Sequence, residues 1–187
     1  MVTKPEMKDL PATRRQRWML YILTKDANYY DRTMTMEQAS QEIAAAKKNQ
    51  MHQAIAKEDN FQHIYNEALE SGRKAGTECT PVPMVVQQHT NMLDDTSSVA
   101  KEWHVPEGVC GFAWVHISPA TASFCKWLLN HKYAGKDSYY GGITIWISDY
   151  GQSYERKCAH AGAMAGIIDQ HKVELGIKHC YSMSRLD

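Results

Sequence analysis

Histidine is the side chain best suited to acid–base catalysis near neutral pH, and this chain of 187 residues contains nine histidines. None of them belongs to an H-x-H pair, an H-E-x-x-H motif or a cysteine–histidine array, the usual patterns of metal-dependent hydrolases. The chain also lacks the G-x-S-x-G nucleophile motif, a Walker phosphate loop and the dinucleotide-binding fingerprint. His116 and His160 are candidates for a small hydrolase, but isolated histidines of this kind are more often structural. The sequence therefore assigns no catalytic residue, no metal site and no cofactor, and it favours a protein that binds rather than one that catalyses.

Aromatic and aliphatic side chains alternate in two segments that we predict to be strands, 110–117 and 143–148. One side of both segments is aliphatic, which is typical of a sheet face packed under helices. The other side carries three large aromatic residues, which are candidates for base stacking: Phe112, Trp114 and Trp146.

This aromatic face has two interpretations. Amphipathic N-terminal helices with Trp18, Leu23 and Ile43 would bury it in a core, which is the more frequent outcome because large exposed aromatic patches are rare in monomers. Alternatively, the face is a platform on which unpaired nucleobases stack. The exposure of Trp114 and Trp146 decides between the two interpretations.

The loop 132–142 and the segment after the predicted strand 143–148 are rich in cations and tyrosines. This composition suits phosphates, bases or a protein partner, although ordinary turns and helix caps have it too. The predicted partner-binding residues lie in the loop 132–142 and at the start of the next helix: Lys132, Lys136, Tyr139, Tyr140, Tyr154 and Arg156.

The N-terminal part of the chain is expected to be helical. Thr13 and Thr35 each begin a T-x-x-Q sequence, which is a helix-capping signature, and they predict helices through about Thr24 and Lys47. A further helix is expected from residue 50 to about residue 75, with a possible break at 57–60. We therefore expect a helical hairpin over residues 1–48 and a connecting helix within 49–80.

Residues 81–187 are predicted to form a compact α+β domain. Its expected strands are 83–87, 110–117, 143–148 and 177–183, and residues 91–101 are expected to form a polar loop. Two helices are expected on one sheet face, the first capped by Ser118-Pro119 and ending near His131, and the second running from Tyr154 to Leu175 before Gly176. Right-handed crossovers around these helices would make the flanking strands parallel and the small sheet mixed.

Composition limits the partners and the cellular location. Lys and Arg number 21 and Asp and Glu number 21, so no global positive charge favours nucleic acid, although a local basic patch remains possible. The chain has no apolar run of about 20 residues, as a membrane helix needs, and its first eight residues are polar. The five cysteines are widely spaced and odd in number, which predicts reduced thiols. We expect a cytoplasmic protein without a membrane partner.

Four strings of residues carry a family resemblance: GVCGFAWV from Gly108, YYGG from Tyr139, YGQS from Tyr150, and SMSRLD at the C-terminus. With them, the chain from Thr80 onwards resembles a family of uncharacterised proteins from phages, plasmids and other mobile elements. The resemblance implies a gene carried by mobile DNA, and it transfers no catalytic residue.

These observations lead to three functional hypotheses. We expect a non-enzymatic binding protein of a mobile element, such as an anti-CRISPR inhibitor of host defence that binds a host or phage protein or a nuclease complex. The alternative is a single-stranded DNA- or RNA-binding protein of phage replication or recombination. A small hydrolase that uses His116 or His160 comes third.

Overall fold

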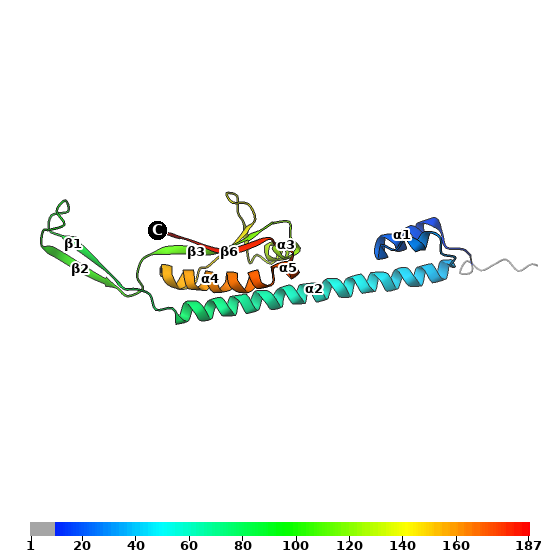
Figure 1. Ribbon diagram of the computed structural model, residues 1–187, viewed down its shortest axis with the longest axis horizontal. Helices are drawn as coiled ribbons and strands as arrows, with labels where there is room; N and C mark the ends of the chain where they lie inside the picture. The colour runs from blue at the N-terminus through cyan, green and yellow to red at the C-terminus, as the bar shows by residue number, and fades with distance from the viewer. Residues whose placement is uncertain (1–9) are drawn as a thin grey trace, which may run out of the picture. The chain divides into compact units, whose positions relative to one another are not determined.

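The computed structural model describes residues 10–187, so the polar N-terminal stretch 1–8 lies outside the described residues. Helices and two small antiparallel sheets make up the chain, which has the predicted α+β fold (Figure 1). The chain divides into two compact units at Asp59, within a long helix. Each unit is described by itself.

The first unit contains helix α1 (Arg14–Thr24), the short 3-10 helix η2 (Ala27–Tyr30) and the first part of helix α2 (Met36–Glu78). Both predicted capping signatures are confirmed. The Thr13 hydroxyl accepts the N–H of Gln16 at 3.2 Å, and the Thr35 hydroxyl accepts the N–H of Gln38 at 3.2 Å. In both cases the glutamine side chain accepts the threonine N–H in return. The unit has a small hydrophobic core of its own, formed by Ala12, Leu20, Met34 and Ala39.

Helix α2 is continuous, so the prediction of two helices separated near residue 48 is wrong, as is the possible break at 57–60. Neither place contains proline, which would remove a backbone hydrogen bond, or glycine, which would lower helix propensity, and charged residues such as Lys57 and Glu58 are good helix formers. Gly72 and Gly76 lie within the helix. Both are buried contact positions, because a Cβ at Gly72 would meet His160 and a Cβ at Gly76 would meet Tyr150.

The main sheet contains strands β3 (Gly111–Ser118), β4 (Gly135–Lys136), β5 (Ile143–Trp146) and β6 (His179–Leu186). Its order is β4-β5-β3-β6 and all neighbouring pairs are antiparallel, so the predicted mixed sheet is wrong. The cause is β4, a two-residue strand that the sequence did not reveal. After α3 (Ser123–Asn130) the chain runs through β4 and turns back, and it therefore enters β5 in the direction opposite to β3. The strands that flank α4 (Tyr154–Gln170) were predicted to be parallel to each other. This prediction is confirmed, since β5 and β6 run in the same direction, although β3 lies between them.

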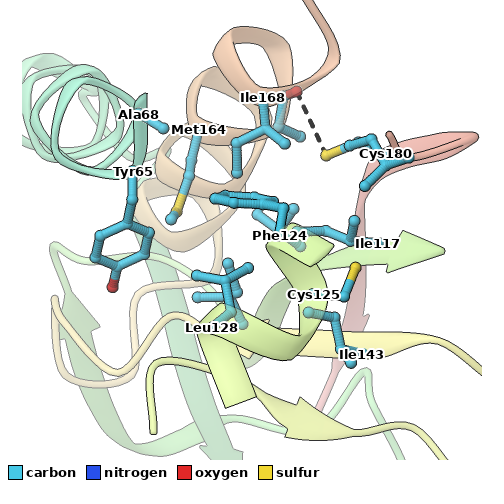
Figure 2. Close-up of a cluster of buried hydrophobic side chains, with 14 of the residues drawn as sticks. Tyr65, Ala68, Ile117, Phe124, Cys125, Leu128, Ile143, Met164, Ile168 and Cys180 are labelled. Atoms are coloured by element: carbon cyan, nitrogen blue, oxygen red, sulfur yellow. Dashed lines mark hydrogen bonds between the residues drawn. The ribbon is translucent and has the colours of Figure 1, made fainter. Parts of the chain in front are cut away.

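The aliphatic face of the sheet is buried as predicted. Val115, Ile117 and Ile143 are fully buried, and they belong to one cluster with residues of α3, α4 and the second part of α2 (Figure 2). The cluster includes Phe124 and Met164, which lie over the sheet from α3 and α4 (Figure 2). The helices of residues 60–187 thus gather on one side of the sheet.

Cysteines contribute to this core as thiols. All five cysteines are free, and Cys125 and Cys180 are buried. The Cys180 thiol donates a hydrogen bond to the carbonyl oxygen of Ala165 at 3.6 Å (Figure 2). The predicted reduced state agrees with the structure.

Two helix predictions need correction. Ser118 does not cap α3, which begins at Ser123 after residue Ala122, so Pro119 lies before the helix and not in its first turn. The second helix is interrupted at His171, and the short helix α5 (Lys172–Leu175) follows and ends at Gly176 in the left-handed conformation, as predicted.

A separate hairpin precedes the main sheet. Strand β1 (Met84–His89) agrees with the predicted strand, but it pairs with β2 (Val99–Val105) in a two-stranded antiparallel sheet. Strand β2 was not predicted, and its first residues lie in the segment expected to be a polar loop. Both faces of this hairpin are largely exposed, so its sequence lacks the apolar–polar alternation that marks a half-buried strand.

Candidate functional site

The aromatic face of the main sheet is open. Trp114 and Trp146 are directly paired across β3 and β5, and their rings lie 4.8 Å apart at an angle of 34°. Phe112 meets Trp146 edge-on with ring centroids 6.4 Å apart. Trp146 is 53% exposed and Trp114 is half-buried, so this face is not buried within the unit of residues 60–187. The N-terminal helix has its own core around Leu20 and does not need the aromatic face to bury its apolar side.

A groove of about 490 Å³ lies on this face. The two indoles and Thr144 contribute to it from the sheet. Its other lining residues come from β4, from the loop after it and from β6, namely Lys136, Asp137, Ser138, Tyr139, Tyr140, Met183, Ser184 and Arg185. The groove therefore brings together two sets of residues that the sequence suggested separately: the stacking tryptophans, and three of the partner-binding residues (Lys136, Tyr139 and Tyr140).

Asp137 holds the tyrosine loop in place. One oxygen of its carboxylate accepts the backbone N–H groups of Tyr139 and Tyr140, both at 2.9 Å. The other oxygen lies 3.5 Å from Nδ1 of His116, which is buried under the loop. The hydrogen bond from the Tyr140 backbone is the main cause that lowers the pKa of Asp137, followed by the Tyr139 backbone and His116. The loop wall of the groove is thus built on an ionised carboxylate.

The remaining charges of the groove are positive. Lys136 and Arg185 line it, and the Arg185 guanidinium lies 5.2 Å from the centre of the Phe112 ring. The Lys157 ammonium contacts the same ring at 5.4 Å, but it is buried and donates to the carbonyl oxygen of Gly111 at 3.1 Å. An open pair of indoles flanked by two surface cations can hold a planar ring by stacking and an anionic group beside it.

Three predicted partner-binding residues do not reach the groove. Lys132 is exposed just after α3. Tyr154 shares a hydrogen bond of 2.9 Å with the Ser184 hydroxyl, and Arg156 donates to Glu107 at 2.9 Å and to two carbonyl oxygens at the end of α2. For Tyr154 and Arg156, structural contacts account for the side chains.

Sequence reasoning missed the contribution of β6. Met183 and Arg185 are paired with Trp114 and Phe112 across β3 and β6, so they stand on the aromatic face. Their alternation was visible in the C-terminal sequence, but the register that places them beside the tryptophans was not.

The two candidate catalytic histidines are both buried. His116 contacts the rings of Tyr140 and Tyr181, with centroids 6.3 Å and 5.1 Å away. His160 lies under α2, where its Nδ1 is 3.2 Å from the Tyr150 hydroxyl and where burial lowers its pKa. Their contacts are those of structural residues. Within residues 10–187 no three metal-ligating side chains gather at one place, and no helix there is both long and apolar enough to cross a membrane.

Comparisons of this chain with models of protein families, with curated proteins and with solved structures found no match. A function must therefore be inferred from the site itself.

Proposed function

We propose that this protein binds single-stranded nucleic acid on the open aromatic face of its main sheet. Unpaired bases stack on Trp114 and Trp146, and the adjoining phosphates lie near Lys136 and Arg185. The observation that carries the proposal is the pair of neighbouring indoles left open on the two central strands of the sheet.

The topology supports this proposal by analogy. The segment from β3 to β6 has the β-α-β-β-α-β connectivity of ferredoxin-like domains, with its helices on one face. RNA-recognition motifs use a four-stranded sheet with aromatic side chains on which two or three bases stack. Trp114 on β3 and Trp146 on β5 occupy the central strands of such a sheet.

Energetic considerations favour stacking over charge as the source of affinity. A base stacked on an aromatic side chain contributes about 1–3 kcal/mol, and such stacking tolerates any base. Two phosphate contacts would make the logarithm of the affinity fall with the logarithm of salt concentration with a slope of only about −1.4. Binding at the groove should therefore persist at moderate salt.

The test measures binding of a fluorescently labelled oligothymidylate and of a labelled RNA of the same length by anisotropy. W114A and W146A are each expected to weaken binding by about tenfold, the energetic equivalent of one lost stack. The control is W103A, which removes a partly exposed indole of β2 outside the groove and should leave binding unchanged. Equal binding by all three variants, with unchanged circular dichroism, would reject the groove as the site.

The hypothesis of an anti-CRISPR-like inhibitor uses the same surface with a protein partner. Exposed Tyr139 and Tyr140, held on a fixed loop, have the amphipathic character common in protein interfaces. It is tested by adding the protein to purified CRISPR nucleases: inhibition that is lost in Y139S/Y140S, while oligonucleotide binding remains, would assign the surface to a protein. Full cleavage at a large molar excess across several nuclease types would remove this hypothesis.

A further inference from the structure

Helix α1 carries an exposed basic and aromatic surface that the groove does not include. Arg14, Arg15 and Arg17 lie in its first turn and just after it, and residues 14–24 contain no acidic residue. Arg14 and Arg15 line a hollow of about 540 Å³ together with Trp18 and Tyr30, and no carboxylate among residues 10–187 lines it. We call these four residues the α1 hollow.

The side chains of the α1 hollow are available to a ligand. Trp18 is 49% exposed and Tyr30 is 42% exposed. Within residues 10–187, Arg14 and Arg15 form no ion pair or hydrogen bond through their guanidinium groups. Arg17 differs from them: its Nη1 donates to the carbonyl oxygen of Tyr30 at 3.2 Å and so fixes Tyr30 beside the helix.

Charge is distributed unevenly between the two units. Residues 10–59 contain eight Lys and Arg against six Asp and Glu, whereas residues 60–187 contain eleven against thirteen. The unit with the aromatic groove therefore has no excess of positive charge with which to attract a polyanion. The excess lies in the unit that contains α1.

We propose that the α1 hollow is a second contact site for single-stranded nucleic acid, in which Arg14 and Arg15 bind phosphates and Trp18 stacks on a base. This inference rests on the proposed function and extends it, because it adds two phosphate contacts and one stacked base at α1 to the stacking on the sheet. Guanidinium groups with an adjacent indole provide both parts of a sequence-tolerant strand contact.

The experiment measures the salt dependence of binding of a labelled oligothymidylate by the full chain. R14Q/R15Q removes two cations without lowering helix propensity much, and loss of two phosphate contacts should reduce the steepness of the salt dependence by about 1.4. The matched control is K47Q/K48Q, which removes two exposed charges of α2 in the same unit and outside the α1 hollow. It should keep the wild-type slope. W18A should weaken binding about tenfold without changing the slope.

The outcomes separate this inference from the proposed function. If R14Q/R15Q and K47Q/K48Q behave alike while W146A loses affinity, the α1 hollow is not a contact site and the groove stands. If R14Q/R15Q flattens the salt dependence while W114A and W146A bind normally, the α1 hollow stands and the groove fails. Binding to vesicles of phosphatidylserine that is lost in R14Q/R15Q, with oligonucleotide binding unchanged, would overturn the inference and assign the α1 hollow to a lipid surface.

Discussion

Gly72 is the position where a single methyl group should distinguish a packing requirement from a backbone preference. It lies inside helix α2, where alanine is favoured over glycine by about 1 kcal/mol. However, a Cβ at this position would lie 2.3 Å from Cδ2 of His160 and 3.0 Å from the carbonyl oxygen of the same residue. The imidazole is held by the Tyr150 hydroxyl, so it cannot swing aside without losing a hydrogen bond.

The expected result is a net loss of stability. Overpacking a tight site costs about 1–3 kcal/mol, and this site is at the high end because backbone lies behind the ring. After the helix preference of about 1 kcal/mol is subtracted, G72A should lower the free energy of unfolding by about 2 kcal/mol, equivalent to a fall in Tm of about 4–8 °C for a domain of this size. The control is G162A on α4, where nothing lies within 4 Å of the added Cβ, and it should be neutral or raise stability by up to about 1 kcal/mol.

Urea unfolding followed by tryptophan fluorescence measures both variants, since four of the five tryptophans lie within residues 60–187. Circular dichroism at zero denaturant checks that α2 remains helical. If G72A proves as stable as G162A, the close contact between α2 and α4 at His160 does not exist, and the assignment of Gly72 and Gly76 as contact positions is wrong.

Three further predictions follow from buried or bonded ionisable groups. Burial lowers the pKa of His160, so the unfolded chain binds the proton more tightly than the folded chain. The free energy of unfolding should therefore be constant above about pH 6.5 and fall as the pH drops below that value. H160Q should reduce the change in the urea midpoint between pH 7 and pH 5, and an unchanged pH profile in H160Q would contradict this assignment. Burial raises the pKa of Cys125 to about 11 and that of Cys180 to about 12. A thiol reagent at pH 8 should therefore label the three half-buried cysteines of the native protein first, and Cys125 and Cys180 only after unfolding. Rapid labelling of all five thiols would contradict the burial of Cys125 and Cys180. D137A should release the Tyr140 backbone and weaken oligonucleotide binding several-fold while the circular dichroism spectrum stays unchanged, because the carboxylate orders a surface loop. Unchanged binding would show that the loop wall does not contact the ligand.

Several features of this fold were predictable because their causes are local. The caps at Thr13 and Thr35 depend on hydrogen bonds between residues three positions apart. The left-handed end at Gly176 depends on one backbone conformation, which glycine adopts without strain. The aliphatic face depends on a period of two within a single strand.

The tertiary structure decided whether the aromatic face of the sheet is buried or exposed. The sequences of β3 and β5 predict an aromatic face, but whether apolar residues elsewhere in the chain cover it depends on the cores that those residues form. Here Leu20 is buried in a core within its own unit, and Trp146 remains open.

The candidate site depends on long-range pairing in the same way. The antiparallel register of β6 with β3 places Arg185 beside Phe112, and the two-residue strand β4 directs Tyr140 to the same face. Residues distant in sequence meet in the groove only because the strands pair. The strand pairing is stabilised by burial of the aliphatic face, and not by contacts among the residues of the groove. The sequence by itself therefore determined which residue types were available for stacking, and the packing of the domain determined that they share one open groove.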